Sequence, residues 1–102
     1  MTPLFSRQCC VSDAEGSVFK LTITFNMPEK DNEFGGFKSV ANIKCHLFEK
    51  DVSSTGEDEA QSFFSLPNIV VSYLIGRRRY GHIVFWMEVG DLEYSDFWAY
   101  KE

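Results

Sequence analysis

A chain of 102 residues with 44% hydrophobic and 25% charged residues fits one globular domain, so we expect a single domain over residues 1–102. The formal net charge of −5 argues against nucleic acid and anionic membranes as partners, because both attract a basic surface. No basic segment followed by an apolar run opens the sequence, and no stretch approaches the ~20 apolar residues of a membrane span. We therefore expect a cytoplasmic protein.

Alternation of apolar and polar residues predicts two strands before Pro28. The first, roughly Phe5 to Ser12, is weak. The second is clear, since five of its apolar residues share one face: Phe19, Leu21, Ile23, Phe25 and Met27. The turn between these two strands is predicted at Ala14–Ser17.

A third strand is predicted from Phe37 to Phe48, after a charged loop at Glu29–Gly36. One face of this strand carries Phe37, Ala41, Ile43, Cys45 and Leu47. The short connections predict that the three strands are consecutive and antiparallel.

Between Glu57 and Arg79 the apolar residues change to a helical spacing, with one predicted buried face: Ala60, Phe63, Phe64, Pro67, Val71 and Leu74. Ser54 and Thr55 stand where a capping box would begin this helix. Pro67 cannot sit inside a regular helix, so we expect a kink there, or two short helices meeting at Leu66–Pro67.

A last strand is predicted at His82–Val89, with Ile83, Phe85, Met87 and Val89 facing the core, followed by a short turn within Asp91–Tyr100. The expected fold is therefore α+β, with a mainly antiparallel four-stranded sheet, one long Pro-kinked helix on one face, and the order β-β-β-α-β. The other sheet face is predicted to be polar, apart from an apolar patch of Val40, Phe48, Val84 and Trp86.

The candidate binding site lies in the last eighteen residues, 85–102, which hold six aromatic residues and five acids against one base. Exposed rings with carboxylates between them suit a basic, partly apolar protein partner. The predicted partner-binding residues are Trp86, Glu88, Asp91, Glu93, Tyr94, Asp96 and Tyr100. The alternative is that most of these rings close the end of the core.

No catalytic motif is present, and an enzyme is not expected. His46 and His82, the two histidines, both fall on the predicted polar face, without a readable nucleophile or orienting carboxylate. Cys45 and His46 are adjacent on a strand and so point apart. Arg77–Arg79 complement the helix dipole, with partner binding as the alternative.

No metal or cofactor is expected either. Cys9, Cys10 and Cys45 are an odd count without the pair spacing of a zinc site, and we expect free thiols; a site made of these cysteines with His46 is the alternative. The C-terminal carboxylates do not fit a calcium-loop frame.

Two stretches, DEAQSFFSLPNIVVSYLI and HIVFWMEVGDLEYSDFW, resemble small uncharacterised bacterial proteins grouped as a domain of unknown function. The resemblance implies a compact α+β domain with no assigned activity. More loosely, the size and acidic sign are similar to bacterial immunity proteins, small inhibitors that mask a toxin, often a basic nuclease.

We therefore expect a binding module, or an immunity-type inhibitor, that docks a basic partner through its C-terminal surface. The alternative is a structural domain that forms a homodimer through the open sheet face around Trp86. A small enzyme using His46 or His82 as base is the third hypothesis.

Overall fold

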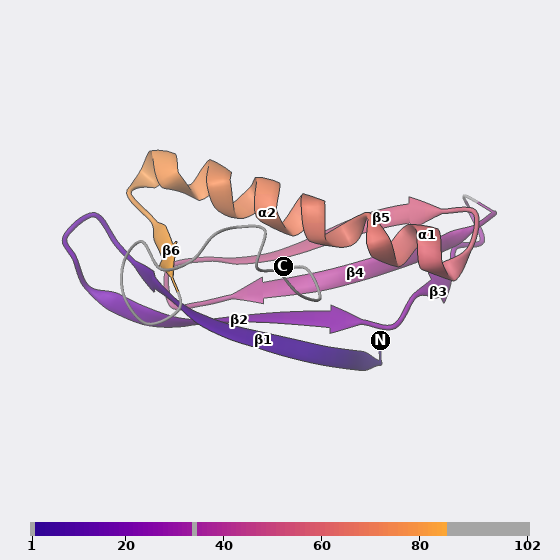
Figure 1. Cartoon of the computed structure of the whole chain (residues 1–102), viewed down its shortest axis with the longest axis horizontal. Coiled ribbons are helices and arrows are strands. Elements are labelled where there is room, and N and C mark those ends of the chain that lie inside the picture. Colours follow the sequence, from indigo (N-terminus) through magenta and orange to yellow (C-terminus); the bar gives the residue numbers. More distant parts are fainter. Residues whose placement is uncertain (1, 34, 86–102) are drawn as a thin grey trace, which may run out of the picture.

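The computed structural model describes residues 2–33 and 35–85 of the chain. The described part is an α+β fold with one antiparallel sheet and helices on one of its faces (Figure 1). The elements in chain order are β1 (Pro3–Ser12), β2 (Val18–Asn26), β3 (Glu29–Lys30), β4 (Phe37–Lys44), β5 (Glu49–Gly56), α1 (Glu59–Phe64), α2 (Leu66–Gly76), the 3-10 helix η1 (Arg77–Tyr80) and β6 (Ile83–Phe85).

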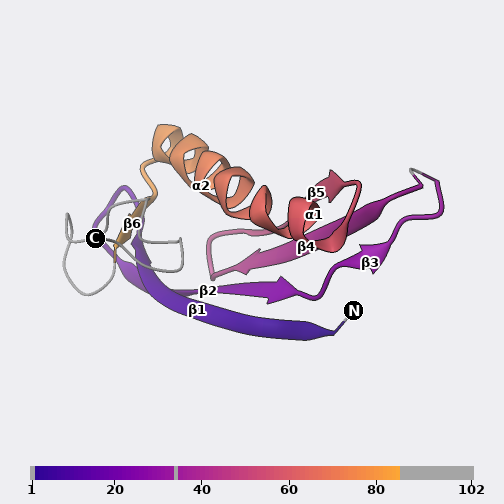
Figure 2. The same cartoon turned by 45° about the vertical axis from the view of Figure 1, so that its right-hand side comes forward.

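Within the described residues the sheet has six strands, and β4 lies between β5 on one side and β2 with the short β3 on the other. β1 follows β2, and β6 pairs with the far side of β1 at Cys10–Ser12. All of these pairings are antiparallel. Figure 2 shows the long strands curving beneath the helices.

β2 forms the centre of the sheet because its apolar residues alternate with threonines and a lysine. Leu21 and Ile23 are fully buried and Phe25 is nearly so, as the sequence predicts, whereas Met27 is exposed. Across β2, Cys9 lies opposite Leu21, and Ile43 of β4 lies opposite Ile23. The core therefore begins as rows of apolar side chains on one face of three strands.

The expected count of four strands was wrong because β5 and β3 carry too little apolar signal. The strand predicted from Phe37 to Phe48 is β4, and it ends at Lys44. The amide of Cys45 then donates to the carbonyl of Phe48 (2.9 Å) in a tight turn. The chain then returns as β5, in which Val52 is the one large apolar residue. Ser54 and Thr55 belong to this strand, so the prediction that they cap the helix was also wrong.

The helical segment is two short helices, one of the two forms expected from Pro67, and the break falls at Ser65. Asp58 caps α1, since its carboxylate accepts a hydrogen bond from the amide of Gln61 (2.7 Å). Pro67 lies in the first turn of α2, where backbone N–H groups have no acceptor within the helix. Proline, which has no N–H, therefore costs no helical hydrogen bond there.

The buried helical face differs from the predicted one, and of the predicted set Leu74 alone is fully buried. The face that meets the sheet recurs every four residues as Ser62, Leu66, Val70 and Leu74. Phe64, predicted to be buried, is 71% exposed. This orientation buries Leu66, Val70 and Leu74 and brings Ser62 to Ser39 of β4 inside the protein, Oγ to Oγ at 3.0 Å.

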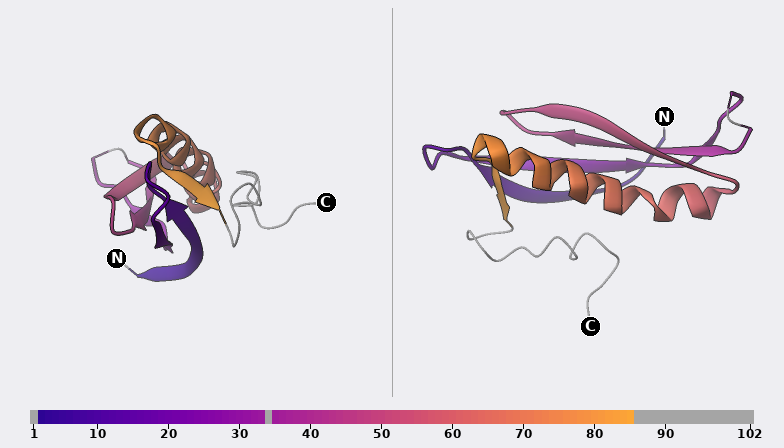
Figure 3. Two further views of the ribbon diagram at one scale, coloured as in Figure 1. Left: turned by 90° about the vertical axis from the view of Figure 1, so that its left-hand side faces the viewer. Right: turned by 90° about the horizontal axis from the view of Figure 1, so that it is seen from above.

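Both helices pack closest to β4 and β5, and Figure 3 shows them from the end and from above, on one face of the sheet. At β6 the predicted phase was wrong for two residues: Val84, opposite Val11, is buried, whereas Ile83 is 43% exposed. Phe85 is buried as predicted. No helix in the described residues has both the length and the apolarity needed to cross a membrane.

Candidate functional site

The predicted C-terminal site, with the short turn expected there, lies outside the described residues. This applies to all seven of its members: Trp86, Glu88, Asp91, Glu93, Tyr94, Asp96 and Tyr100. Their role in binding therefore stays a prediction.

The apolar patch predicted on the open sheet face does not form from its described members. Val84 is 4% exposed, and the ring of Phe48 packs edge-on against Tyr73 of α2 at 5.8 Å between centroids. Val40 lies near the other end of β4, close to the β3–β4 loop. Trp86, the fourth member, lies outside the described residues.

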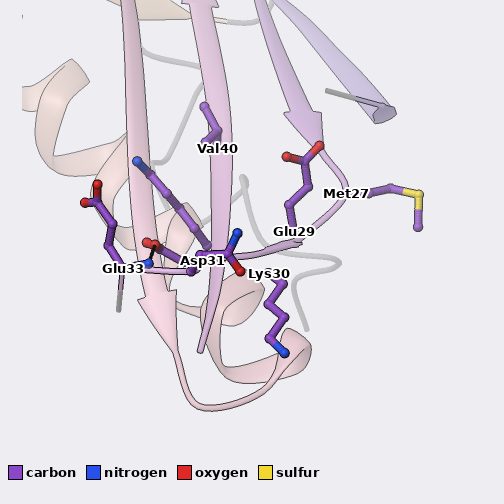
Figure 4. Close-up of a pocket in the computed structure, with 8 residues that line it drawn as sticks. Met27, Glu29, Lys30, Asp31, Glu33 and Val40 are labelled. Carbon is purple, nitrogen blue, oxygen red and sulfur yellow. Dashed lines mark hydrogen bonds between the residues drawn. The ribbon is translucent and has the colours of Figure 1, made fainter. Parts of the chain in front are cut away.

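Around Val40 the surface forms an open hollow of about 370 Å³, with Met27, Glu29, Lys30 and the β3–β4 loop beside it (Figure 4). Glu29 stands directly opposite Lys38 in the β3–β4 pairing. The lining has three acids and two bases, so most of its charges are opposed by a neighbour of the other sign.

The two histidines have different surroundings. His46 is exposed and stacks on Phe19, with ring centroids 4.9 Å apart. His82 is partly buried, and its Nδ1 accepts hydrogen bonds from Arg77 Nε (3.2 Å) and Nη2 (3.1 Å). In the described part of the chain, no carboxylate hydrogen bonds to either ring.

Arg77 is the centre of a group that we call the Arg77 cluster: Phe48, Arg77, Tyr80 and His82. The guanidinium lies 4.6 Å from the ring centroid of Phe48 and 4.6 Å from that of Tyr80. Phe48 also stacks on His82, with centroids 5.5 Å apart and an interplanar angle of 18°. The cluster therefore connects η1 and the residue before β6 to the turn that follows β4.

The pKa of His82 is lowered, first by partial burial and then by the positive charge of Arg77, while Asp13 acts in the opposite direction. A neutral imidazole is consistent with the hydrogen bonds, since Nδ1 must present a lone pair to Arg77. The arginine run is thus only partly a complement of the helix dipole, because Arg77 is held by rings and an imidazole.

The cysteines are free thiols, and Cys9 is buried. Burial raises the pKa of Cys9 to about 12, with Cys10 and Cys45 adding to the shift and Arg7 opposing it. Cys9 therefore cannot supply a thiolate near neutral pH. Within residues 2–33 and 35–85, no group of three or more histidine, cysteine, aspartate or glutamate side chains is placed to hold a metal ion.

A second aromatic group lies where β1 begins, beside α1. We call it the aromatic edge: Phe5, Phe63 and Phe64. Phe5 stacks on the buried Phe25 with centroids 5.0 Å apart, and lies 6.2 Å from Phe63, which in turn lies 6.2 Å from Phe64. Phe5 is 44% exposed and Phe64 71%, so the outer part of this chain of rings faces solvent.

An acidic segment, Glu57–Glu59, adjoins the aromatic edge and is exposed throughout. Glu59 and Phe63 are four residues apart on α1 and so are neighbours on the helix surface. We call the three residues Glu57, Asp58 and Glu59 the acidic flank. Carboxylates beside exposed rings therefore occur in the described part of the chain as well as in the predicted C-terminal site.

Sequence reasoning missed the aromatic edge because it placed Phe63 and Phe64 on the buried helical face. Adjacent residues on a helix are about 100° apart, so both rings cannot face the sheet together with Ser62 and Leu66. Phe5 shares its side of β1 with the buried Cys9, but it stays partly exposed because the helices pack closest to β4 and β5.

Comparisons with protein-family models, with curated proteins and with solved structures found no match for this chain. The function must therefore be argued from the chain's own surfaces.

Proposed function

We propose that this protein is a non-enzymatic binding module that docks a basic, partly apolar segment of another protein. The observation that carries the proposal is the aromatic edge with its acidic flank: exposed rings fixed on a buried one, next to three carboxylates. The proposal keeps the predicted partner chemistry and adds a second place on the molecule where that chemistry is available.

The rings are suited to binding because they are already ordered. Phe5 is fixed by its stack on Phe25, which is 1% exposed, and Phe63 touches both rings. Aromatic side chains held in this way contribute contact area with little further loss of conformational entropy on binding. Phe64, the most exposed large apolar residue of the described chain, extends the surface outward.

The negative charge of the acidic flank favours a basic partner. Glu57, Asp58 and Glu59 are consecutive, and the whole chain carries a net charge of −5. Clustered exposed carboxylates steer a cationic partner and speed its association, with an effect that salt weakens.

The strand beside the rings suggests how a partner segment is held. Within the described residues, no strand pairs with Leu4, Phe5 and Ser6 on the side of β1 away from β2. An exposed strand edge can accept an added extended segment through main-chain hydrogen bonds, while neighbouring side chains select its sequence.

The predicted C-terminal residues also combine aromatic and acidic side chains. We include them in the proposal as a second part of the binding surface. An immunity-type inhibitor is one form that such a module takes; its partner would then be a basic nuclease whose activity falls on mixing.

The test is a nuclear magnetic resonance titration of the full chain with two synthetic peptides. Both alternate leucine with a charged residue over about eight positions, a usual strand length; one carries lysines and the other glutamates. We expect the lysine peptide to shift the amides of Leu4–Ser6 and of Phe63 and Phe64, and the glutamate peptide to leave them unchanged.

Two matched double variants test the role of charge. Glu57→Lys with Glu59→Lys reverses the acidic flank and spares the helix cap at Asp58, whereas Glu15→Lys with Glu33→Lys makes the same charge change at exposed loops. We expect the first pair to weaken binding of the lysine peptide at least about tenfold, roughly 1.4 kcal/mol, and the second pair to change it little. Equal effects of the two pairs, or shifts away from the aromatic edge, would contradict the proposal.

The same strand edge also supports the second candidate function, a homodimer formed edge to edge by two copies of β1. This differs from the dimer expected from the sequence, which used the open sheet face. Sedimentation velocity over a wide range of concentration decides it, because a monomer at every concentration excludes the dimer.

A further inference from the structure

We propose that the Arg77 cluster is a pH-sensitive contact that holds η1 and the start of β6 against the turn at residues 45–48, and releases them when His82 takes up a proton. The cluster lies at the opposite end of the helical layer from the aromatic edge. The proposal is therefore independent of the proposed binding function.

The geometry requires a neutral imidazole. Arg77 Nε and Nη2 both donate to Nδ1 of His82, at 3.2 and 3.1 Å, and guanidinium nitrogens have no lone pair to offer in return. A protonated imidazole carries N–H groups on both nitrogens and cannot accept either bond. Protonation therefore replaces two hydrogen bonds with two adjacent positive charges.

The groups around His82 do not offset that repulsion. Arg77 and Tyr80 come from η1, Phe48 from the turn after β4, and Tyr73 of α2 packs on Phe48. Asp13, in the β1–β2 turn, is the acid that favours the protonated form, but its effect is smaller than those of burial and of Arg77.

The element that depends on this contact is short. β6 has three residues, and Gly81, which precedes His82, packs so closely on Ala14 that an added Cβ would lie 2.7 Å from the Ala14 Cβ. Loss of the Arg77–His82 contact frees one end of that strand, while the pairing of Val84 with Val11 remains to hold it. We expect β6 to open locally from β1 before the sheet unfolds.

The direction of the pH effect follows from the lowered pKa of His82 in the folded protein. Protonation favours states in which the contact is open, so protection of β6 is complete above the unfolded-state pKa of about 6.5 and is lost as pH falls through the folded-state value.

Amide hydrogen exchange of the full chain tests this, with rates corrected for their intrinsic pH dependence. Between about pH 7.5 and pH 5, we expect protection at Ile83–Phe85 and Cys10–Ser12 to fall severalfold, because the open state binds the proton more tightly. Protection at the β2–β4 pairing, Thr22–Phe25, should change much less, since it contacts no member of the cluster.

Two histidine variants give the control. His82→Gln keeps an oxygen that can accept from Arg77 but does not titrate, and should make β6 protection independent of pH. His46→Gln removes the exposed histidine on Phe19 and should leave the pH dependence as it is.

Should His82→Gln not fold, the unaltered protein still decides the matter. The ring protons of His82 and the β6 amides must then change over the same pH range. Protection that does not vary with pH, or that varies without following the His82 ring, would overturn the proposal.

Discussion

The two ends of the helical layer are joined to the sheet by different chemistry. At the α1 end, small neutral groups make the contact: Gly56 lies against the backbone of α1, and Ser62 bonds to Ser39. At the η1 end, a cation, two rings and an imidazole do so in the Arg77 cluster. The first contact depends on close steric fit and the second on charge.

This difference predicts different weaknesses. A buried serine pair without charge is insensitive to pH and salt but intolerant of added volume. A partly exposed cation–ring cluster tolerates changes of shape and responds to protonation. Substitutions at the two ends should therefore differ in how much they destabilise the protein.

Gly56→Ala should be the most damaging change. Its Cβ would lie 2.5 Å from the backbone nitrogen of Ser62 and 2.9 Å from the carbonyl carbon of Gln61, so α1 would have to move away from β5. We expect a loss of about 3 kcal/mol in the free energy of unfolding, measured by urea denaturation.

The control for Gly56 is Gly76→Ala, at the last residue of α2, where nothing lies within 4 Å of the added Cβ. Here alanine should stabilise the protein by about 0.5 kcal/mol, because it favours the helix over the unfolded chain. A similar loss at both glycines would mean that close packing at Gly56 is not the cause.

Ser62→Ala should cost about 2 kcal/mol, and more than Ser39→Ala. Ser62 Oγ donates to the carbonyl of Glu59 (2.9 Å), so Ser39 must be the donor in the bond between the two hydroxyls. Removing Ser62 leaves a buried donor without an acceptor, whereas removing Ser39 leaves only a lone pair unfilled. The double variant, measured in the same denaturation series, should cost less than the sum of the single changes.

Arg77→Lys tests the other end of the layer and should cost about 1 kcal/mol at neutral pH. Lysine keeps the charge but loses the planar group that lies over Phe48 and Tyr80 and donates twice to His82. An unchanged midpoint of thermal unfolding would show that charge alone, without the planar contact, maintains this end.

Phe64→Ser should change stability by less than about 0.5 kcal/mol, since most of the ring is in water. The same variant should weaken binding of the lysine–leucine peptide. A marked loss of stability instead would assign Phe64 to the core and remove it from the binding surface.

Sequence patterns predicted the parts of the fold in which apolar side chains alternate or recur regularly. The buried row of Leu21, Ile23 and Phe25 in β2 was correct, and Pro67 correctly indicated an interruption of the helix, for which a kink and two short helices were the two forms expected. These features are local, so a short window of sequence contains their cause.

The parts that failed depend on contacts between distant residues. β5 is recognisable as a strand only when its partner β4 is known. Its buried residues include Ser54 and Gly56, which are small rather than apolar and so give no alternating apolar pattern. The buried helical face includes Ser62, whose partner Ser39 lies far away in the sequence, so its place on that face is not readable from helical spacing. The Arg77 cluster likewise unites residues from separate elements, and a run of three arginines gives no hint of which one the rings hold.

The order of the strands has a consequence for how the molecule is assembled. β1 pairs with β2, β2 with β4 across the short β3 segment, and β4 with β5, so these long strands can pair soon after each is made. β6 is the exception, since Phe85 must find Cys10 across nearly the whole described length. The pairing of β6 with β1 should therefore form last during folding, and refolding kinetics should show a late step in the protection of its amides.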